Sequence, residues 1–157
     1  MKTKQQSSPV RRGAATIEFA LMAPVFLALV LGVTETSRMF EIKNQLTMAA
    51  REGARTAAME RSGLVAEGQT TNAKVVQDVK NYLKASGLDP NSINVQIVSH
   101  DSPGSSFNLD DPANSLKYFE LKISVPFSAA STICPPDLTD YHLESKIVFR
   151  NSKTQLQ

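Results

Sequence analysis

Cysteine, histidine and tryptophan are scarce in this chain, whose 157 residues include one cysteine, two histidines and no tryptophan. With Cys134 alone, no disulfide can form within the chain, and no site with several thiolate ligands can hold a metal. We interpret Cys134 as a small apolar side chain before Pro135, rather than as a reactive thiol or an intermolecular disulfide. His100 and His142 have neither a cysteine nor a spaced pair of carboxylates beside them. The sequence therefore predicts no metal site.

Signatures of catalysis and of cofactor binding are also missing. The chain contains no glycine-rich phosphate loop and no nucleophile elbow. Acidic residues gather between residues 101 and 111, but they lack the repeated aspartates, the glycine and the distal glutamate of a calcium-binding loop. We therefore expect no catalytic residue and no cofactor, and predict that the chain is not an enzyme.

Basic residues are concentrated at the N-terminus. Lys2, Lys4, Arg11 and Arg12 precede Gly13 with no acid among them, and the rest of the chain carries 13 basic and 15 acidic residues. A nucleic-acid-binding protein would spread its lysines and arginines over the folded domain, so we expect no nucleic-acid partner. A short basic tip is instead typical of a chain that is oriented in a membrane.

A long hydrophobic run follows the basic tip. From Ala14 to Val33 the only charged residue is Glu18, and about 20 helical residues span the ~30 Å of bilayer hydrocarbon. Because the positive charges precede the run, the positive-inside rule places the N-terminus in the cytoplasm and the C-terminal domain outside. Pro24 is tolerated in such a helix and predicts a mild kink. We therefore expect a single-pass protein of the inner (cytoplasmic) membrane.

A cleavable secretory signal is the competing interpretation, because it also combines a basic region with an apolar core. It would need an A-x-A-like site after an apolar core of about 7–15 residues. Here the core is longer and continues into Gly32-Val33-Thr34-Glu35-Thr36 without that pattern. An exported enzyme released by signal peptidase would lack both its cleavage site and its active site.

One carboxylate lies inside the hydrophobic run. An ionised acid deep in hydrocarbon costs roughly 2.5–3.5 kcal/mol, so we expect Glu18 to be neutral, paired or close to the interface. In one interpretation its side chain reaches the headgroups or Arg11 and Arg12. In the other interpretation its partner belongs to another molecule.

The residues around Glu18 resemble a known processing motif. Arg11-Arg12-Gly13 followed by AATIEFALMAPVFLALVLG resembles the leader and first helix of type IV pilin-like proteins, in which a basic leader ends in glycine and four residues precede Glu-Phe. Gly13, Glu18 and Phe19 match that motif position for position. Within this group, the continuation through TSRMF and AAREGARTAA resembles the TadE-like family of the tight-adherence (Flp pilus) system. The resemblance covers residues 11–58.

The resemblance implies both processing and assembly at these residues. A membrane-embedded aspartyl prepilin peptidase would cleave after Gly13 at the cytoplasmic face, where the missing Cβ lets a protease approach the backbone closely. The new amine of Ala14 would be mostly cationic at neutral pH. In pilin-like assemblies this amine would neutralise the glutamate of a neighbouring subunit, which makes Glu18 an assembly contact. The implied partners are the membrane, the prepilin peptidase, other pilin-like subunits and pilus assembly proteins.

Beyond the hydrophobic run the helical pattern continues. Apolar and small residues recur at spacings of three and four, which places them on one helix face: Ile42, Leu46, Ala49, Ala50, Gly53 and Ala57. We expect one near-continuous helix over about residues 14–60, because no proline occurs from residue 25 to residue 58. Small side chains at Ala49, Gly53 and Ala57 allow a second backbone to approach closely. That backbone belongs to the chain's own domain or to another subunit, and both can hold.

The last part of the chain has the pattern of a small α+β domain. After a break at residues 62–71, an amphipathic helix ends at Gly87. Strand-like runs follow at residues 93–97, 119–127 and 141–149. We expect an antiparallel sheet of about three strands packed on helix. The polar loop from residue 99 to residue 115 is long for so small a domain, and we expect it to be mobile.

These observations predict a basic cytoplasmic leader at 1–13, a transmembrane helix at 14–34, a helical extension at 35–62 and an exported domain at 63–157. The predicted function is that of a minor pilin or pseudopilin-like component of a tight-adherence pilus assembly system, membrane anchored and non-catalytic. The alternative is an unprocessed single-pass envelope anchor whose outer domain binds a partner or a surface. Processing after Gly13 distinguishes the two.

Overall fold

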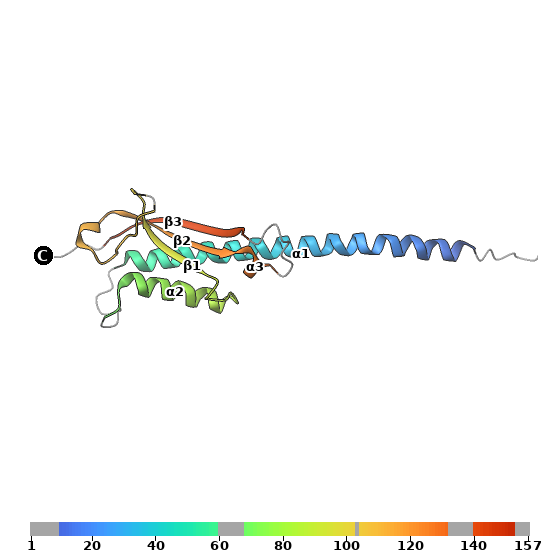
Figure 1. Ribbon diagram of the computed structural model, residues 1–157, viewed down its shortest axis with the longest axis horizontal. Helices are drawn as coiled ribbons and strands as arrows, with labels where there is room; N and C mark the ends of the chain where they lie inside the picture. Colours follow the sequence, from blue (N-terminus) through green and yellow to red (C-terminus); the bar gives the residue numbers. More distant parts are fainter. Residues whose placement is uncertain (1–9, 60–67, 103, 132–139, 153–157) are drawn as a thin grey trace, which may run out of the picture. The chain divides into compact units, whose positions relative to one another are not determined.

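The computed structural model describes residues 10–59, 68–102, 104–131 and 140–152, with side chains from residue 13 onward. The chain divides into two compact units, residues 1–37 and 38–157, and each is described by itself (Figure 1). Lys2, Lys4 and Cys134, to which the sequence assigned roles, lie outside the described residues. Residues 62–67, the first part of the predicted break, lie outside them as well.

One helix, α1, runs from Val10 to Ala58 and includes Pro24. It begins at Val10, whereas the sequence pattern predicts a start near residue 14. Where the hydrophobic run ends, Thr36 and Ser37 donate hydrogen bonds to the carbonyl oxygens four residues earlier, at 2.8 and 2.9 Å. This back-bonding satisfies the hydroxyl groups on the helix itself, and α1 continues through these polar residues.

In the second unit, helices and a three-stranded sheet form the α+β arrangement that the sequence predicts. The sheet is antiparallel throughout, with strand order β1-β2-β3. The predicted fold class is confirmed. Besides the C-terminal part of α1, the elements are α2 (Thr71–Ala85), β1 (Asn94–Ser99), the 3₁₀ helix η1 (Pro112–Asn114), β2 (Tyr118–Pro126), the short α3 (Phe127–Ala130) and β3 (His142–Arg150).

Local signals set both ends of α2. The hydroxyl of Thr70 accepts a hydrogen bond from the backbone N–H of Ala73 at 3.2 Å, which caps the first turn. At the other end Gly87 adopts a φ of 91°, and the N–H of Leu88 donates to the carbonyl oxygen of Leu83 at 3.1 Å. A left-handed glycine with this hydrogen bond ends a helix, so α2 stops just before the predicted glycine.

The hydrophobic core lies between one face of the sheet and the two helices. Inward and outward side chains alternate along β2, so that Phe119, Leu121, Ile123 and Val125 are fully buried. A hydrogen bond of 3.2 Å from the Ser145 hydroxyl to the Thr47 hydroxyl joins β3 to α1. The face of α1 predicted from its spacing is buried in this core: Ile42, Leu46, Ala49, Ala50, Gly53 and Ala57.

The segment between β1 and β2 differs from the mobile polar loop that was expected. Phe107 and Leu109 are buried in the core, and the ring of Phe107 stacks on that of Phe119 with centroids 5.6 Å apart. Asn72 of α2 fixes the same segment, since its side chain donates to the Phe107 carbonyl at 2.6 Å and accepts from the Leu109 N–H at 2.9 Å. These contacts fix a loop in which most residues are polar.

Candidate functional site

The residues of the processing motif all lie on α1 and are all exposed. Gly13, Ala14, Glu18 and Phe19 are helical, and the ring of Phe19 is 74% exposed. Ala14 and Glu18 are four residues apart, which places them one above the other on the same side of the helix. The backbone therefore presents the predicted new N-terminus and the carboxylate together.

Nothing in the described fold requires a glycine at position 13. A Cβ built at this position meets nothing within 4 Å, and the residue lies in regular helix. Gly53 is the opposite case, because its Cβ would lie 2.4 Å from Val79 Cγ2 and 2.8 Å from Leu121 Cδ2. The glycine at position 53 is thus explained by packing, whereas the described structure gives no such reason at position 13.

The hydrophobic run presents an apolar surface on all sides of the helix. A helix that is apolar all round belongs in a protein core or in a membrane, and the most apolar stretch of α1 is not buried within the chain. By length and composition, α1 from Gly13 to Ala58 is the one described helix able to cross a membrane. Its exposed large side chains are Ile17, Phe19, Leu21, Met22, Val25, Phe26, Leu27, Leu29, Val30, Leu31 and Val33.

Glu18 is the exception on this apolar surface. Its side chain is exposed, and within the described part of the chain no hydrogen bond or ion pair engages it. An unpaired carboxylate inside hydrocarbon is costly. Both interpretations of Glu18, contact with headgroups or Arg11 and Arg12 and contact with another molecule, involve groups outside the described side chains.

Comparison with known proteins bears on this same stretch of helix. Residues 13–55 match the family described as TadE-like protein. Over this segment the chain is similar to TadE-like proteins. The match begins at the glycine of the processing motif and ends at Arg55, in the last turn of α1. No curated protein and no solved structure matches the chain.

The match falls within residues 11–58, the same stretch that carries the resemblance to the tight-adherence system. The apolar part of α1 suits a membrane anchor. Within the described residues, no group of three or more histidine, cysteine, aspartate or glutamate side chains is placed to hold a metal.

The small residues predicted for helix packing lie in the interior of the second unit. Ala49 and Ala57 are almost fully buried, and Gly53 lies against Val79 of α2 and Leu121 of β2. Both of the partners that were considered, the chain's own domain and another subunit, would need this face. The structure gives it to the chain's own domain.

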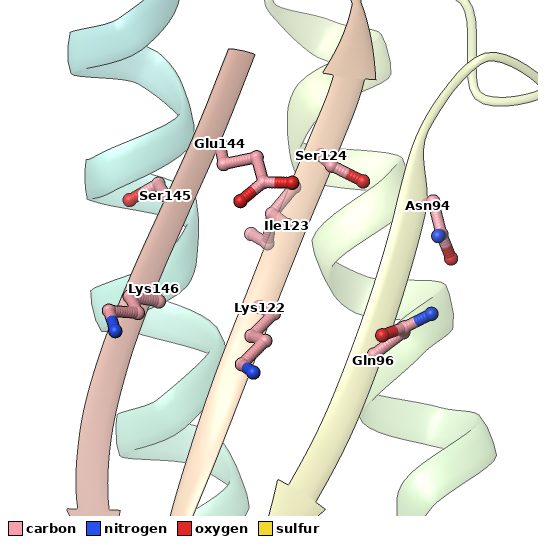
Figure 2. A pocket seen from close by; sticks show the side chains of 8 residues that line it. All are labelled: Asn94, Gln96, Lys122, Ile123, Ser124, Glu144, Ser145 and Lys146. Atoms are coloured by element: carbon pink, nitrogen blue, oxygen red, sulfur yellow. The ribbon is translucent and has the colours of Figure 1, made fainter. Parts of the chain in front are cut away.

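The outer face of the sheet carries a polar depression that sequence patterns did not single out. It has a volume of about 200 Å³. Figure 2 shows its side chains projecting from all three strands. Its lining consists of Asn94, Gln96, Lys122, Ile123, Ser124, Glu144, Ser145 and Lys146. Lys122 lies directly opposite Lys146 in the β2–β3 register, which brings two like charges close together.

Next to this depression Glu120 forms the principal charged contact of the sheet. Its carboxylate lies 2.9 Å from His100 Nδ1 and 3.5 Å from Lys122 Nζ. The hydrogen bond to His100 lowers the pKa of Glu120 below its ordinary value, and burial opposes this only in part. The register indicates where such contacts form, since outward-facing residues alternate along β2, but no sequence motif marks His100 as a partner.

Proposed function

We propose that this chain is a minor pilin or pseudopilin-like subunit of a tight-adherence pilus assembly system, anchored in the inner membrane and non-catalytic. One observation carries the proposal: the TadE-like match covers the same helix that exposes an apolar surface with a single unpaired carboxylate. An anchor alone needs the apolar surface but not the carboxylate. A subunit that packs against other pilin-like helices uses both.

The proposed organisation places residues 1–13 in the cytoplasm, 14–34 in the membrane, and the helical extension 35–62 with the domain 63–157 outside. The basic residues ahead of Gly13 support this orientation, because positive charge is retained on the cytoplasmic side. A periplasmic-type reporter fused after Gln157 should be active, and a cytoplasmic-type reporter should not. Activity of the cytoplasmic reporter with the hydrophobic run intact would refute the orientation.

Processing by a prepilin peptidase is proposed between Gly13 and Ala14. Glycine lowers helix stability by about 1 kcal/mol relative to alanine, which eases opening of α1 at the bond to be cleaved. It also removes the Cβ that would obstruct a protease. The absence of any packing contact at Gly13 supports a requirement that comes from outside the folded chain.

Gly13→Leu tests this proposal, and Gly32→Leu is its matched control. Both glycines are exposed on α1, and a Cβ at either position meets nothing within 4 Å, so neither substitution disturbs the described fold. In cells that contain the peptidase, the intact mass of the wild type and of Gly32→Leu should correspond to a chain beginning at Ala14. Gly13→Leu should retain the leader. A wild-type chain that keeps its leader would instead favour the unprocessed envelope anchor.

The proposed partners are other pilin-like subunits and pilus assembly proteins, with Glu18 as the assembly contact. After cleavage the amine of Ala14 is a cation at the same end of the helix as the carboxylate. A neighbouring subunit displaced along its helix axis can place this amine beside Glu18, which offsets the cost of a charge in hydrocarbon. The unpaired state of Glu18 among the described residues supports this role.

A further inference from the structure

The two edge strands of the sheet differ in whether another segment of the chain covers their outer side. β1 and β3 are the outer strands, and β3 is nine residues long. On the β1 side, the segment 105–107 adds hydrogen bonds to the edge: Phe107 N–H donates to the Ile97 carbonyl, and Ser99 N–H donates to the Ser105 carbonyl, both at 3.0 Å. This cover blunts the C-terminal half of the β1 edge. In the described part of the chain, β3 has no equivalent cover along its outer side (Figure 1).

The hydrogen-bond pattern identifies which groups of β3 face outward. Phe127 N–H donates to the Tyr141 carbonyl, and Asn151 N–H donates to the Lys117 carbonyl. Both pairs join odd-numbered residues and continue the β2–β3 register by one step beyond each end. Because hydrogen-bonded and non-hydrogen-bonded pairs alternate in an antiparallel ladder, the odd-numbered residues of β3 bond to β2. The outward N–H and C=O groups are those of His142, Glu144, Lys146, Val148 and Arg150.

The inner flank of this edge is basic. Ser145 of β3 is hydrogen bonded to Thr47 of α1, and α1 lies behind β3 in Figure 2. Lys43 precedes Thr47 by four residues and Arg51 follows it by four, so both lie on the side of α1 next to β3. Both are exposed, as is Arg55 one turn further along the helix. Arg55 pairs only loosely with Glu52, at 3.7 Å, and no acid within the described ranges pairs with Lys43 or Arg51.

The outer flank adds further positive charge and some apolar surface. The side chains of Lys146 and Arg150 project from the face of the sheet opposite the core, and the side chain of one acid, Glu144, projects from the same face. Ile147 and Phe149, which face the core, are only partly buried because they stand at the edge of the sheet. A fourth strand beside β3 would cover them and would meet an excess of basic side chains on both of its faces.

We propose that the free edge of β3 binds an extended, acidic segment of a partner protein as a fourth strand. Addition of a strand to an exposed sheet edge gives affinity through main-chain hydrogen bonds and specificity through alternating side chains. The acidic character follows from the basic groups on both flanks, and a second copy of this chain would bring the same basic excess. This inference extends beyond the role in pilus assembly and does not depend on processing at Gly13.

Amide hydrogen exchange on the full-length chain in detergent micelles tests the proposal. The probes are two synthetic nine-residue peptides, one alternating threonine and glutamate, the other alternating threonine and lysine. In the free chain the amides of Lys146 and Val148 should exchange fast, and those of Ile147 and Phe149 slowly. When nine-tenths of the chain is bound by the glutamate peptide, exchange at the outward amides should slow by about tenfold. The lysine peptide should have no such effect.

Two pairs of variants separate strand addition from loss of the fold. Val148→Pro removes one outward N–H but none of the bonds to β2, so it should abolish the peptide effect while Ile147 stays protected. Val148→Thr keeps the N–H and should behave as wild type. Arg51→Glu should weaken binding of the glutamate peptide, whereas Lys84→Glu, on an exposed position of α2, should not.

Three outcomes would overturn the proposal. If neither peptide slows the outward amides, the charges on β3 serve to keep the edge unpaired, as charges on exposed edges do. Equal slowing by both peptides would remove the acidic specificity. Protection of the outward amides that rises with protein concentration, without peptide, would make the occupant a second copy of the chain.

Discussion

Gly53→Ala tests whether the core is packed as tightly around α1 as the structure shows. The added methyl group would lie 2.4 Å from Val79 Cγ2 and 2.8 Å from Leu121 Cδ2, well inside the ~3.5–4.0 Å of a favourable carbon–carbon contact. Val79 is β-branched and stiff at χ1, so it cannot turn aside freely. Overpacking of this kind costs about 1–3 kcal/mol.

Helix propensity acts in the opposite direction. Replacing glycine by alanine inside a helix contributes about 1 kcal/mol of stability where nothing obstructs the methyl group. The expected net change in the free energy of unfolding is therefore a loss of up to about 2 kcal/mol. Gly53→Leu extends the obstruction further and should prevent the native packing of α2 on α1.

Urea unfolding of the full-length chain in a mild detergent measures this change. The chain has no tryptophan, and its three tyrosines, Tyr82, Tyr118 and Tyr141, all belong to the second unit, so tyrosine fluorescence follows that unit alone. In the double variant Gly53→Ala with Val79→Ala, the new methyl group occupies space that Val79 has left. Its loss of stability should be smaller than the sum of the two single losses. A single variant Gly53→Ala that is more stable than the wild type would refute the packing argument.

Three further predictions follow from the remaining contacts. Glu18→Ala should leave membrane insertion and cleavage unchanged, since removal of the charge eases transfer into lipid by roughly 2.5–3.5 kcal/mol, but should reduce crosslinking to other pilin-like subunits and the number of surface pili; wild-type levels of both would contradict the pairing. Asn72→Ala removes both hydrogen bonds to the segment after β1 and should lower the free energy of unfolding by about 1–3 kcal/mol, measured by urea unfolding. His100→Ala should raise the pKa of Glu120 toward its ordinary value, because the hydrogen bond that lowers it is lost. The stability difference between wild type and this variant should be full above the ordinary carboxyl pKa and disappear as the pH falls through the lowered pKa of the wild type, with the Glu120 carboxyl followed by NMR.

Most secondary structure in this chain could be predicted because its apolar residues follow regular periods. Spacings of three and four along α1 identified the face that the structure buries, and strict alternation identified β2 with its four inward side chains. Element ends were less well determined, since α1 continues from Val10 through the motif at Gly13. Helix ends depend on local hydrogen bonds that composition describes only loosely.

The anchored segment after β1 could not be predicted in the same way. Phe107 and Leu109 stand among serine, aspartate and asparagine residues with no helical or strand period. They become core residues because Asn72, more than 30 residues earlier, supplies a donor and an acceptor to their backbone. Such a contact between distant residues depends on the tertiary fold and leaves no trace in a local pattern.

Two of the three glycines of α1, Gly13 and Gly53, show how structure separates residues that a sequence treats alike. Gly53 is needed inside the fold, where a methyl group would strike Val79 and Leu121. Gly13 meets nothing, and Glu18 on the same exposed surface has no partner among the described residues. A residue whose chemistry has no consequence within its own chain is selected, if at all, by contacts with other molecules. For Gly13, the fitting partner is a protease that needs an unobstructed backbone. For Glu18, it is a neighbouring subunit that supplies a cation.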